Sequence, residues 1–235
     1  MAYSVGSSHG ISAGRFIAES DFQTWEYKVN ISGLEGAFAA AHVSWAHSSG
    51  ALIAFGDLLP QGLGGARIAV KVPEGWDVVT DSRSSTKNVY DIEDVDTAVL
   101  HAGPAFRKMS SKISGTAIEI AIAGDWLFSD DETAKMASSI FASYSELFGG
   151  VPADKVQIAI RPFPTKYPHG HWEASSRGSN ITIMSSDMPF KTQSLQRLHE
   201  QLRHELFHLW IPNAISLTGN YDWFYEGFAL YNSLK

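Results

Sequence analysis

The sequence predicts an α+β fold in which an N-terminal all-β domain precedes a domain that contains helices. Residues 25–122 hold short β-branched or alternating segments separated by Gly, Pro, Asp and Ser, which is the pattern of strands. After Gly124 the pattern changes to longer segments with helix start and stop signals. We therefore expect a β domain over residues 1–124 and a helix-bearing domain over residues 125–235.

The strands expected in the first domain are short. A Pro-Glu-Gly-Trp sequence at residues 73–76 separates two of them, as a turn would. The segments that carry the strand pattern are residues 25–31, 51–55, 66–72, 98–101 and 114–122.

The second domain is expected to hold helices and further strands. One helix follows Ser129, has acidic residues in its first turn and ends at phenylalanine before two glycines, over residues 129–148. A second runs from about residue 192 or 194 to about residue 211, where Pro212 stops it. A third covers residues 222–234 with Asp222 as its cap. Strands are expected at 156–160 and 181–184, with a Gly, Ser and His-rich loop at 167–179 between them.

Composition excludes several classes of function. Of the 235 residues 44% are hydrophobic and 18% charged, which is typical of a folded globular protein. The net charge of −7 comes without a basic block, so we expect no nucleic-acid partner. No apolar run reaches the ~20 residues of a membrane-spanning helix, so we expect no membrane insertion. Because the chain has no cysteine, any metal must be held by His and carboxylates.

The N-terminus carries no basic start followed by an apolar block, so no signal peptide is recognised in it. The absence of cysteine fits the cytoplasm and the bacterial periplasm equally. The sequence therefore leaves both compartments open, and it does not predict an oligomeric state.

The second predicted helix carries a metal-binding motif. Its apolar stripe, at spacings of three and four, is formed by Leu195, Leu198, Leu202, Leu206 and Leu209. His204-Glu205-Leu206-Phe207-His208 matches the H-E-x-x-H pattern, in which one helical turn brings two imidazoles to one zinc ion. The carboxylate of Glu205, beside the first ligand, can accept a proton from water.

Catalytic zinc has three protein ligands and one open position, so a third ligand is needed. Glu226, in the setting Trp-Phe-Tyr-Glu-Gly-Phe at the start of the third predicted helix, supplies it. The sequence therefore predicts one zinc ion on His204, His208 and Glu226, although cobalt or manganese would also accept this ligand set.

At these residues the sequence resembles the gluzincin zinc peptidases, and within them the glycyl aminopeptidase family. The resemblance rests on HELFHLW at residues 204–210 and WFYEGF at residues 223–228, with weaker matches at residues 73–76 and 91–96. It implies a thermolysin-like catalytic domain, zinc, a peptide substrate and removal of small N-terminal residues. It also implies a helical lobe after the third ligand with an oxyanion donor, so we expect the chain to be truncated at its C-terminus.

The resemblance also implies a substrate-binding role for Glu173. The Gly-His-Trp-Glu sequence at residues 170–173 is similar to the family stretch whose glutamate pairs with the free amino group of the substrate. Glu173 precedes the predicted strand at 181–184, which we expect to form the edge of the active-site cleft.

Two alternatives to an aminopeptidase remain open. The first is an endopeptidase with the same zinc chemistry, which would also cleave an N-acetylated peptide. The second is a non-catalytic module that binds metal or peptide without the C-terminal lobe. Glu205 argues against the second alternative, because a structural zinc site needs no base.

Overall fold

The computed structural model of the chain describes residues 8–12, 15–18, 27–32, 39–60, 62–215 and 218–234. The chain forms two compact units, residues 1–33 and residues 34–235. In the first unit, strands β1 (Ser8–Ser12) and β2 (Arg15–Ala18) pair antiparallel. Of the strand expected at residues 25–31, residues 25 and 26 lie outside the described part, and residues 27–31 are irregular rather than extended in a sheet.

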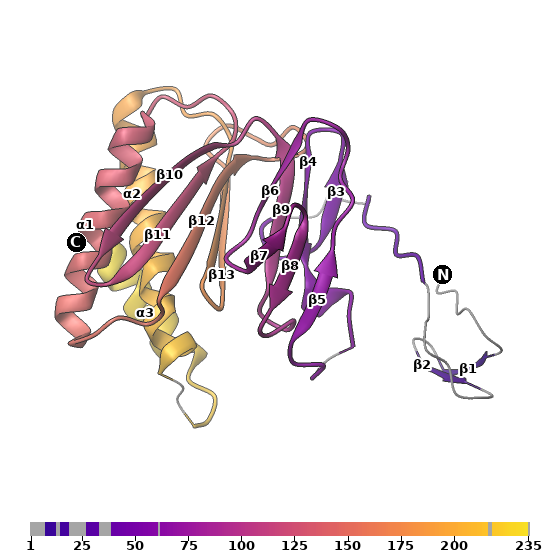
Figure 1. Cartoon of the computed structure of the whole chain (residues 1–235). Helices are drawn as coiled ribbons and strands as arrows, with labels where there is room; N and C mark the ends of the chain where they lie inside the picture. The colour runs from indigo at the N-terminus through magenta and orange to yellow at the C-terminus, as the bar shows by residue number, and fades with distance from the viewer. Residues whose placement is uncertain are drawn as a thin grey trace. The chain divides into compact units, whose positions relative to one another are not determined.

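A five-stranded mixed sheet is the centre of the second unit (Figure 1). The inner pairs β11–β12 and β12–β14 are parallel, whereas the outer pairs β10–β11 and β13–β14 are antiparallel. In spatial order the strands are β10 (Arg107–Ile113), β11 (Thr116–Ile122), β12 (Lys155–Pro162), β14 (Asn180–Ser185) and β13 (Trp172–Arg177). Strand β13 is therefore an edge strand.

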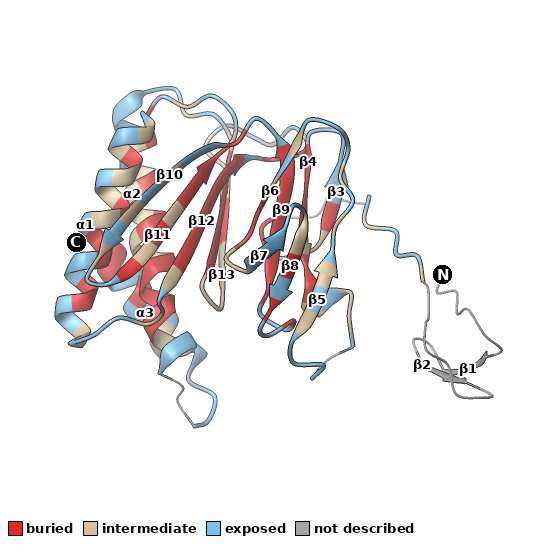
Figure 2. Ribbon diagram, viewed as in Figure 1, coloured by how far each residue is buried: buried red, intermediate tan, exposed pale blue. Residues whose placement is uncertain are grey.

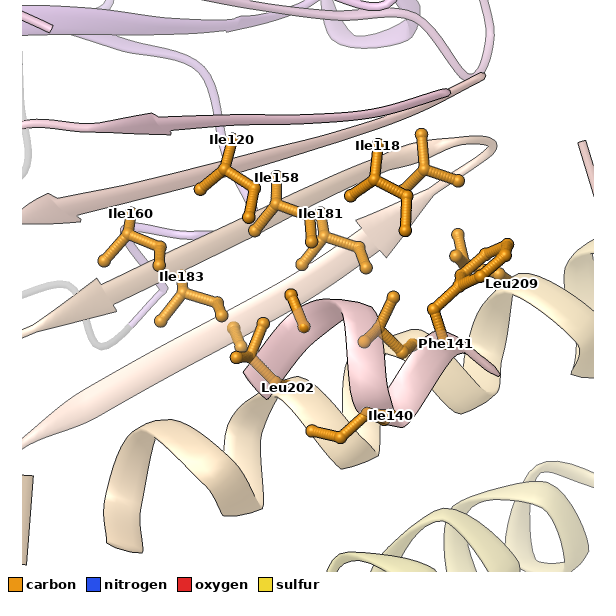
Figure 3. Packing of buried hydrophobic residues seen from close by; sticks show 14 of the residues in the cluster. Ile118, Ile120, Ile140, Phe141, Ile158, Ile160, Ile181, Ile183, Leu202 and Leu209 are labelled. Carbon is orange, nitrogen blue, oxygen red and sulfur yellow. The ribbon is translucent and has the colours of Figure 1, made fainter. Parts of the chain in front are cut away.

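Two helices cover one face of this sheet. Helices α1 (Asp130–Phe148) and α2 (Lys191–His208) pack against it and against each other (Figure 1). Every second residue of β12 and β14 points toward them, as the period of a strand requires. Figure 3 shows the resulting isoleucine rows facing the helices; the labelled residues are Ile118, Ile120, Ile140, Phe141, Ile158, Ile160, Ile181, Ile183, Leu202 and Leu209.

The β-rich N-terminal region lies on the other face. Its strands form a sheet ordered β3 (Trp45–His47), β4 (Gly50–Ala54), β9 (Val99–Pro104) and β6 (Trp76–Val79), and a second ordered β5 (Ala66–Ala69), β8 (Val89–Ile92) and β7 (Arg83–Thr86), with a 3₁₀ turn η1 (Phe55–Asp57) after β4. Buried residues are concentrated in β4, β9, β11, β12 and β14 and on α1 and α2, whereas β5 and β7 are largely exposed (Figure 2).

The side chain of Arg161 joins the five-stranded sheet to the β-rich region. Arg161 of β12 donates from Nη1 to the carbonyl oxygen of Ala51 at 2.8 Å, and its guanidinium lies 4.6 Å from the centre of the Trp45 ring. A Cβ atom at Gly50 would collide with this guanidinium, and the φ of 150° at that residue also favours glycine. Burial lowers the pKa of Arg161 to about 10, which leaves it charged at neutral pH.

The first predicted helix is confirmed. Ser129 caps α1 through a reciprocal capping box with Glu132, and Gly149 ends the helix with a φ of 70°. Predicted strands at 51–55, 66–72, 98–101, 156–160 and 181–184 correspond to β4, β5, β9, β12 and β14.

Three expectations about the sheet and its edge differ from the structure. Strand β11, which we assigned to the N-terminal β domain, pairs with β12, so the sheet continues across the boundary predicted at residue 124. Residues 172–177, expected as loop, form β13. That strand, rather than the one at 181–184, is the edge of the sheet, because β14 is paired on both sides. The partner of β11 could not be predicted, because sequence patterns identify strands but not the strands they pair with. Strand β13 was missed because its sequence is polar, which an edge strand tolerates.

The later helices also differ in their ends. Helix α2 stops at His208, and a π-helical turn η2 (Leu209–Ala214) follows in which Ile211 leaves the helical region. Helix α3 (Asp222–Ser233) has Tyr221 as its N-cap residue, so Asp222 is the first helical residue and not the cap. None of the helices in the described ranges is long and apolar enough to cross a membrane.

Candidate metal centre

The two histidines of the motif project from the C-terminal end of α2 toward one point. Their Nε2 atoms lie 3.1 Å apart, and the rings meet at 74° with centroids separated by 4.8 Å. The leucines of the stripe hold this end of the helix in place: Leu198, Leu202, Leu206 and Leu209 are each at most 3% exposed. The side chain of His204 is 20% exposed, whereas that of His208 is only 8% exposed.

The turn after α2 fixes the tautomer of His208. Its Nδ1 lies 3.0 Å from the carbonyl oxygen of Ile211, whose φ of −130° and ψ of 116° interrupt the helix. A carbonyl oxygen only accepts hydrogen bonds, so Nδ1 carries the hydrogen and, in the neutral ring, Nε2 keeps a free lone pair. This is the arrangement by which histidine ligands are oriented in metal sites.

Helix α3 brings Glu226 to the same point. Its Oε2 atom lies 3.3 Å from Nε2 of His204, and its Oε1 atom lies 3.5 Å from Nε2 of His208. A tetrahedral zinc ion with bonds of 2.0–2.1 Å separates its ligand atoms by about 3.3 Å. The two imidazole nitrogens, 3.1 Å apart, match this spacing, and one donor atom from each of the three residues lies within 4.8 Å of the others, so the three residues could hold one ion.

The electrostatics of His204 also fit a metal ligand. Burial, and next the proximity of His208, lower its pKa, whereas Glu226 opposes that change. A neutral imidazole has the lone pair that a metal requires.

Glu205 lies beside the three ligands in a buried position. Only 4% of the residue is exposed, although a carboxylate is rarely buried without a function or a partner. Burial, and to a smaller degree the charge of Glu226, raise the pKa of Glu205 to about 8, while a hydrogen bond with Ser176 opposes the rise. Ser176 was missed by the sequence analysis, because one serine within a Ser-rich stretch carries no spacing signal.

The remaining predicted site residue, Glu173, is not part of this cluster. It lies opposite Met184 on the face of the sheet that meets the β-rich region, whereas its neighbour Ala174 packs toward the helices. Its carboxylate accepts a hydrogen bond from the backbone N–H of Ala41 at 3.0 Å and contacts Nε2 of His171 at 3.2 Å. The carboxylate is therefore held at the edge strand.

Comparison with known proteins gives a structural similarity. No protein-family model matches the chain, and no curated protein matches its sequence. The fold is similar to the crystal structure of an aminopeptidase N family protein from Idiomarina loihiensis, with a TM-score of 0.76 at 14% sequence identity. The similarity covers 99% of this chain and 44% of that chain. The chain thus combines sheet and helices, with a β-rich N-terminal region, as part of that protein does.

Proposed function

We propose that this chain carries the metal-binding site of a zinc-dependent peptidase with a thermolysin-like catalytic domain. The observation that carries the proposal is the convergence of His204, His208 and Glu226, whose donor atoms lie within 4.8 Å of one another, as three ligands of one ion would. The buried Glu205 beside them supports a catalytic rather than a structural site. The similarity to an aminopeptidase N family protein supports a peptidase by analogy of fold.

In this proposal each residue has one role. His204 and His208 bind through Nε2 and Glu226 through its carboxylate. A zinc ion held by these residues would supply a Lewis acid, which would lower the pKa of a water molecule toward ~7 and polarise a peptide carbonyl. The positive charge of a bound ion would lower the pKa of Glu205 from the value of about 8 that it has in the metal-free protein. Its carboxylate would then accept the proton of the attacking water, and the resulting carboxylic acid would donate it to the leaving amine nitrogen.

We further propose that the peptidase removes small N-terminal residues. This proposal assigns to Glu173, a buried carboxylate on the face of β13 that meets the β-rich region, the binding of the ammonium group of a peptide that lies along the strand. Binding of the ammonium group there distinguishes an aminopeptidase from an endopeptidase, which needs no such contact.

Cleavage of short peptides with free and with N-acetylated N-termini tests the proposal. We expect zinc-dependent cleavage of the free Gly and Ala peptides alone, abolished in Glu205→Gln and reduced in Glu173→Gln. Cleavage of acetylated peptides at a similar rate would indicate an endopeptidase. Zinc binding with no cleavage of either peptide would contradict a catalytic function for this chain.

A further inference from the structure

Helix α3 is buried most deeply in its C-terminal half, while Tyr225 in its N-terminal half packs against the core at its margin. Its buried residues are Ala229, Asn232 and Ser233, which are 0%, 8% and 6% exposed. Glu226 lies in the half that projects toward solvent, and 55% of its side chain is exposed. The position of this carboxylate therefore depends in part on how the C-terminal end of the helix is fixed.

Arg203 of α2 forms a polar contact at that fixed end. Its Nε donates to the carbonyl oxygen of Asn232 at 2.7 Å. Asn232 is the penultimate residue of α3, where backbone carbonyls have no partner within the helix and the helix dipole favours a positive charge. The contact therefore satisfies an acceptor and places a cation at the favourable end of the helix.

Arg203 is itself held from the other side. Its guanidinium carbon lies 5.5 Å from the centre of the Tyr144 ring of α1, and the hydroxyl of Tyr144 donates to the carbonyl oxygen of Arg203 at 2.9 Å. Tyr144 is 1% exposed and belongs to the main core. Arg203 thus connects a rigid part of α1 to the end of α3.

We propose that Arg203 is a positioning residue for metal binding: by fixing the C-terminal end of α3 against α2, it holds Glu226 within reach of the two histidines. Glu226 and Asn232 are six residues apart, which is about 9 Å along a helix. Loss of the contact at one end lets the helix tilt and moves the carboxylate at the other. The inference rests on the proposed zinc site.

A double-mutant cycle on zinc affinity tests this role. Zinc dissociation constants are measured by chelator competition for wild type, Arg203→Met, Glu226→Gln and the double variant. Methionine keeps an apolar stem over Tyr144 but removes the guanidinium. We expect Arg203→Met to weaken zinc binding about tenfold, as loss of a ligand-orienting contact typically does. In the Glu226→Gln background the same change should alter affinity by less than about twofold, because the carboxylate that it positions is gone.

Two controls separate this role from general destabilisation. Arg197 is also on α2 and also lies over an aromatic ring, 5.2 Å from the centre of Trp172, but its ion-pair partner is Glu200 on the same helix. Arg197→Met should leave zinc affinity unchanged. If Arg203→Met does not fold, Arg203→Lys is used, which keeps the charge and loses the directed Nε–H; we expect a smaller loss of affinity that also vanishes with Glu226→Gln.

The outcomes are distinguishable from failure of the zinc site itself. Wild type that binds no zinc overturns both the site and this inference. Weakened binding in Glu226→Gln together with unchanged binding in the Arg203 variants overturns the inference alone. So does an equal loss of affinity on the two backgrounds, since Arg203 would then act independently of Glu226.

Discussion

His208 donates a hydrogen bond from Nδ1 to the carbonyl oxygen of Ile211 across 3.0 Å, and this bond leaves its Nε2 facing Nε2 of His204. The helix must end for this to occur, because within a regular helix the carbonyl of Ile211 would point along the axis toward the next turn. The non-helical backbone of Ile211 therefore takes part in forming the candidate metal site.

Glu205→Gln should abolish turnover without removing the metal. Glutamine keeps the shape of the buried side chain but cannot accept the proton, and loss of a general base typically costs 10²- to 10⁴-fold in rate. Peptide cleavage and zinc content are measured on the same sample. Glu200→Gln, five residues earlier on α2, removes a carboxylate paired with Arg197 and is the matched control. Unchanged turnover in Glu205→Gln would rule out the assigned role.

Ser129→Ala should lower the free energy of unfolding by about 1 kcal/mol. Ser129 accepts a hydrogen bond from the N–H of Glu132 at 3.2 Å, and its own N–H donates to the Glu132 carboxylate at 2.8 Å. Urea unfolding measures the change. Ser143→Ala in the same helix removes only an exposed hydroxyl that donates to Ser139, and should change stability much less. Equal effects of the two substitutions would show that the cap contributes nothing.

Local features were predictable from the sequence, whereas long-range pairing was not. The bounds of α1 follow from a Ser cap and two glycines, and the apolar stripe of α2 from its period, because both depend on neighbouring residues. The convergence of Glu226 with the two histidines was expected from the motif. The edge strand β13, the sheet partner of β11 and the contact of Arg203 with Asn232 depend on residues distant in sequence, and no periodic pattern marks them.

Gly227→Ala should stabilise the protein by about 0.5–1 kcal/mol. Gly227 lies within α3, and among the described residues a Cβ atom added there would meet no heavy atom within 4 Å apart from its chain neighbours and the nearby backbone of the helix. Alanine reduces the conformational freedom of the unfolded chain and favours the helix. Thermal and urea unfolding of the metal-free protein measure the gain. A loss of stability would mean that α3 does not have the helical backbone described here.

Stability should fall as the pH drops below about 6.5 because of His101. His101 belongs to β9 and is buried. Its Nε2 faces β14, where it lies 3.1 Å from Oγ1 of Thr182. Burial, and next the charge of Arg161, lower the pKa of His101 to about 3. Between pH 6.5 and 3 the unfolded chain therefore binds a proton that the folded chain does not, so acid favours unfolding.

The size of this effect can be isolated with His101→Gln. From pH 7 to pH 5 the wild type should lose up to about 2 kcal/mol more than the variant, since each pH unit is worth about 1.4 kcal/mol per proton. Urea unfolding at the two pH values gives the difference. His47→Gln, at an exposed position of β3, should follow the wild type. The same pH dependence in His101→Gln as in wild type would assign the effect to other groups.

The central claim is that His204, His208 and Glu226 hold one metal ion, and the most direct measurement is metal content per chain by elemental analysis. After zinc loading and removal of excess, the account predicts about one zinc per wild-type chain and a loss of that zinc in His204→Ala, His208→Ala and Glu226→Ala. Wild type without zinc, or zinc that remains in all three variants, would contradict it.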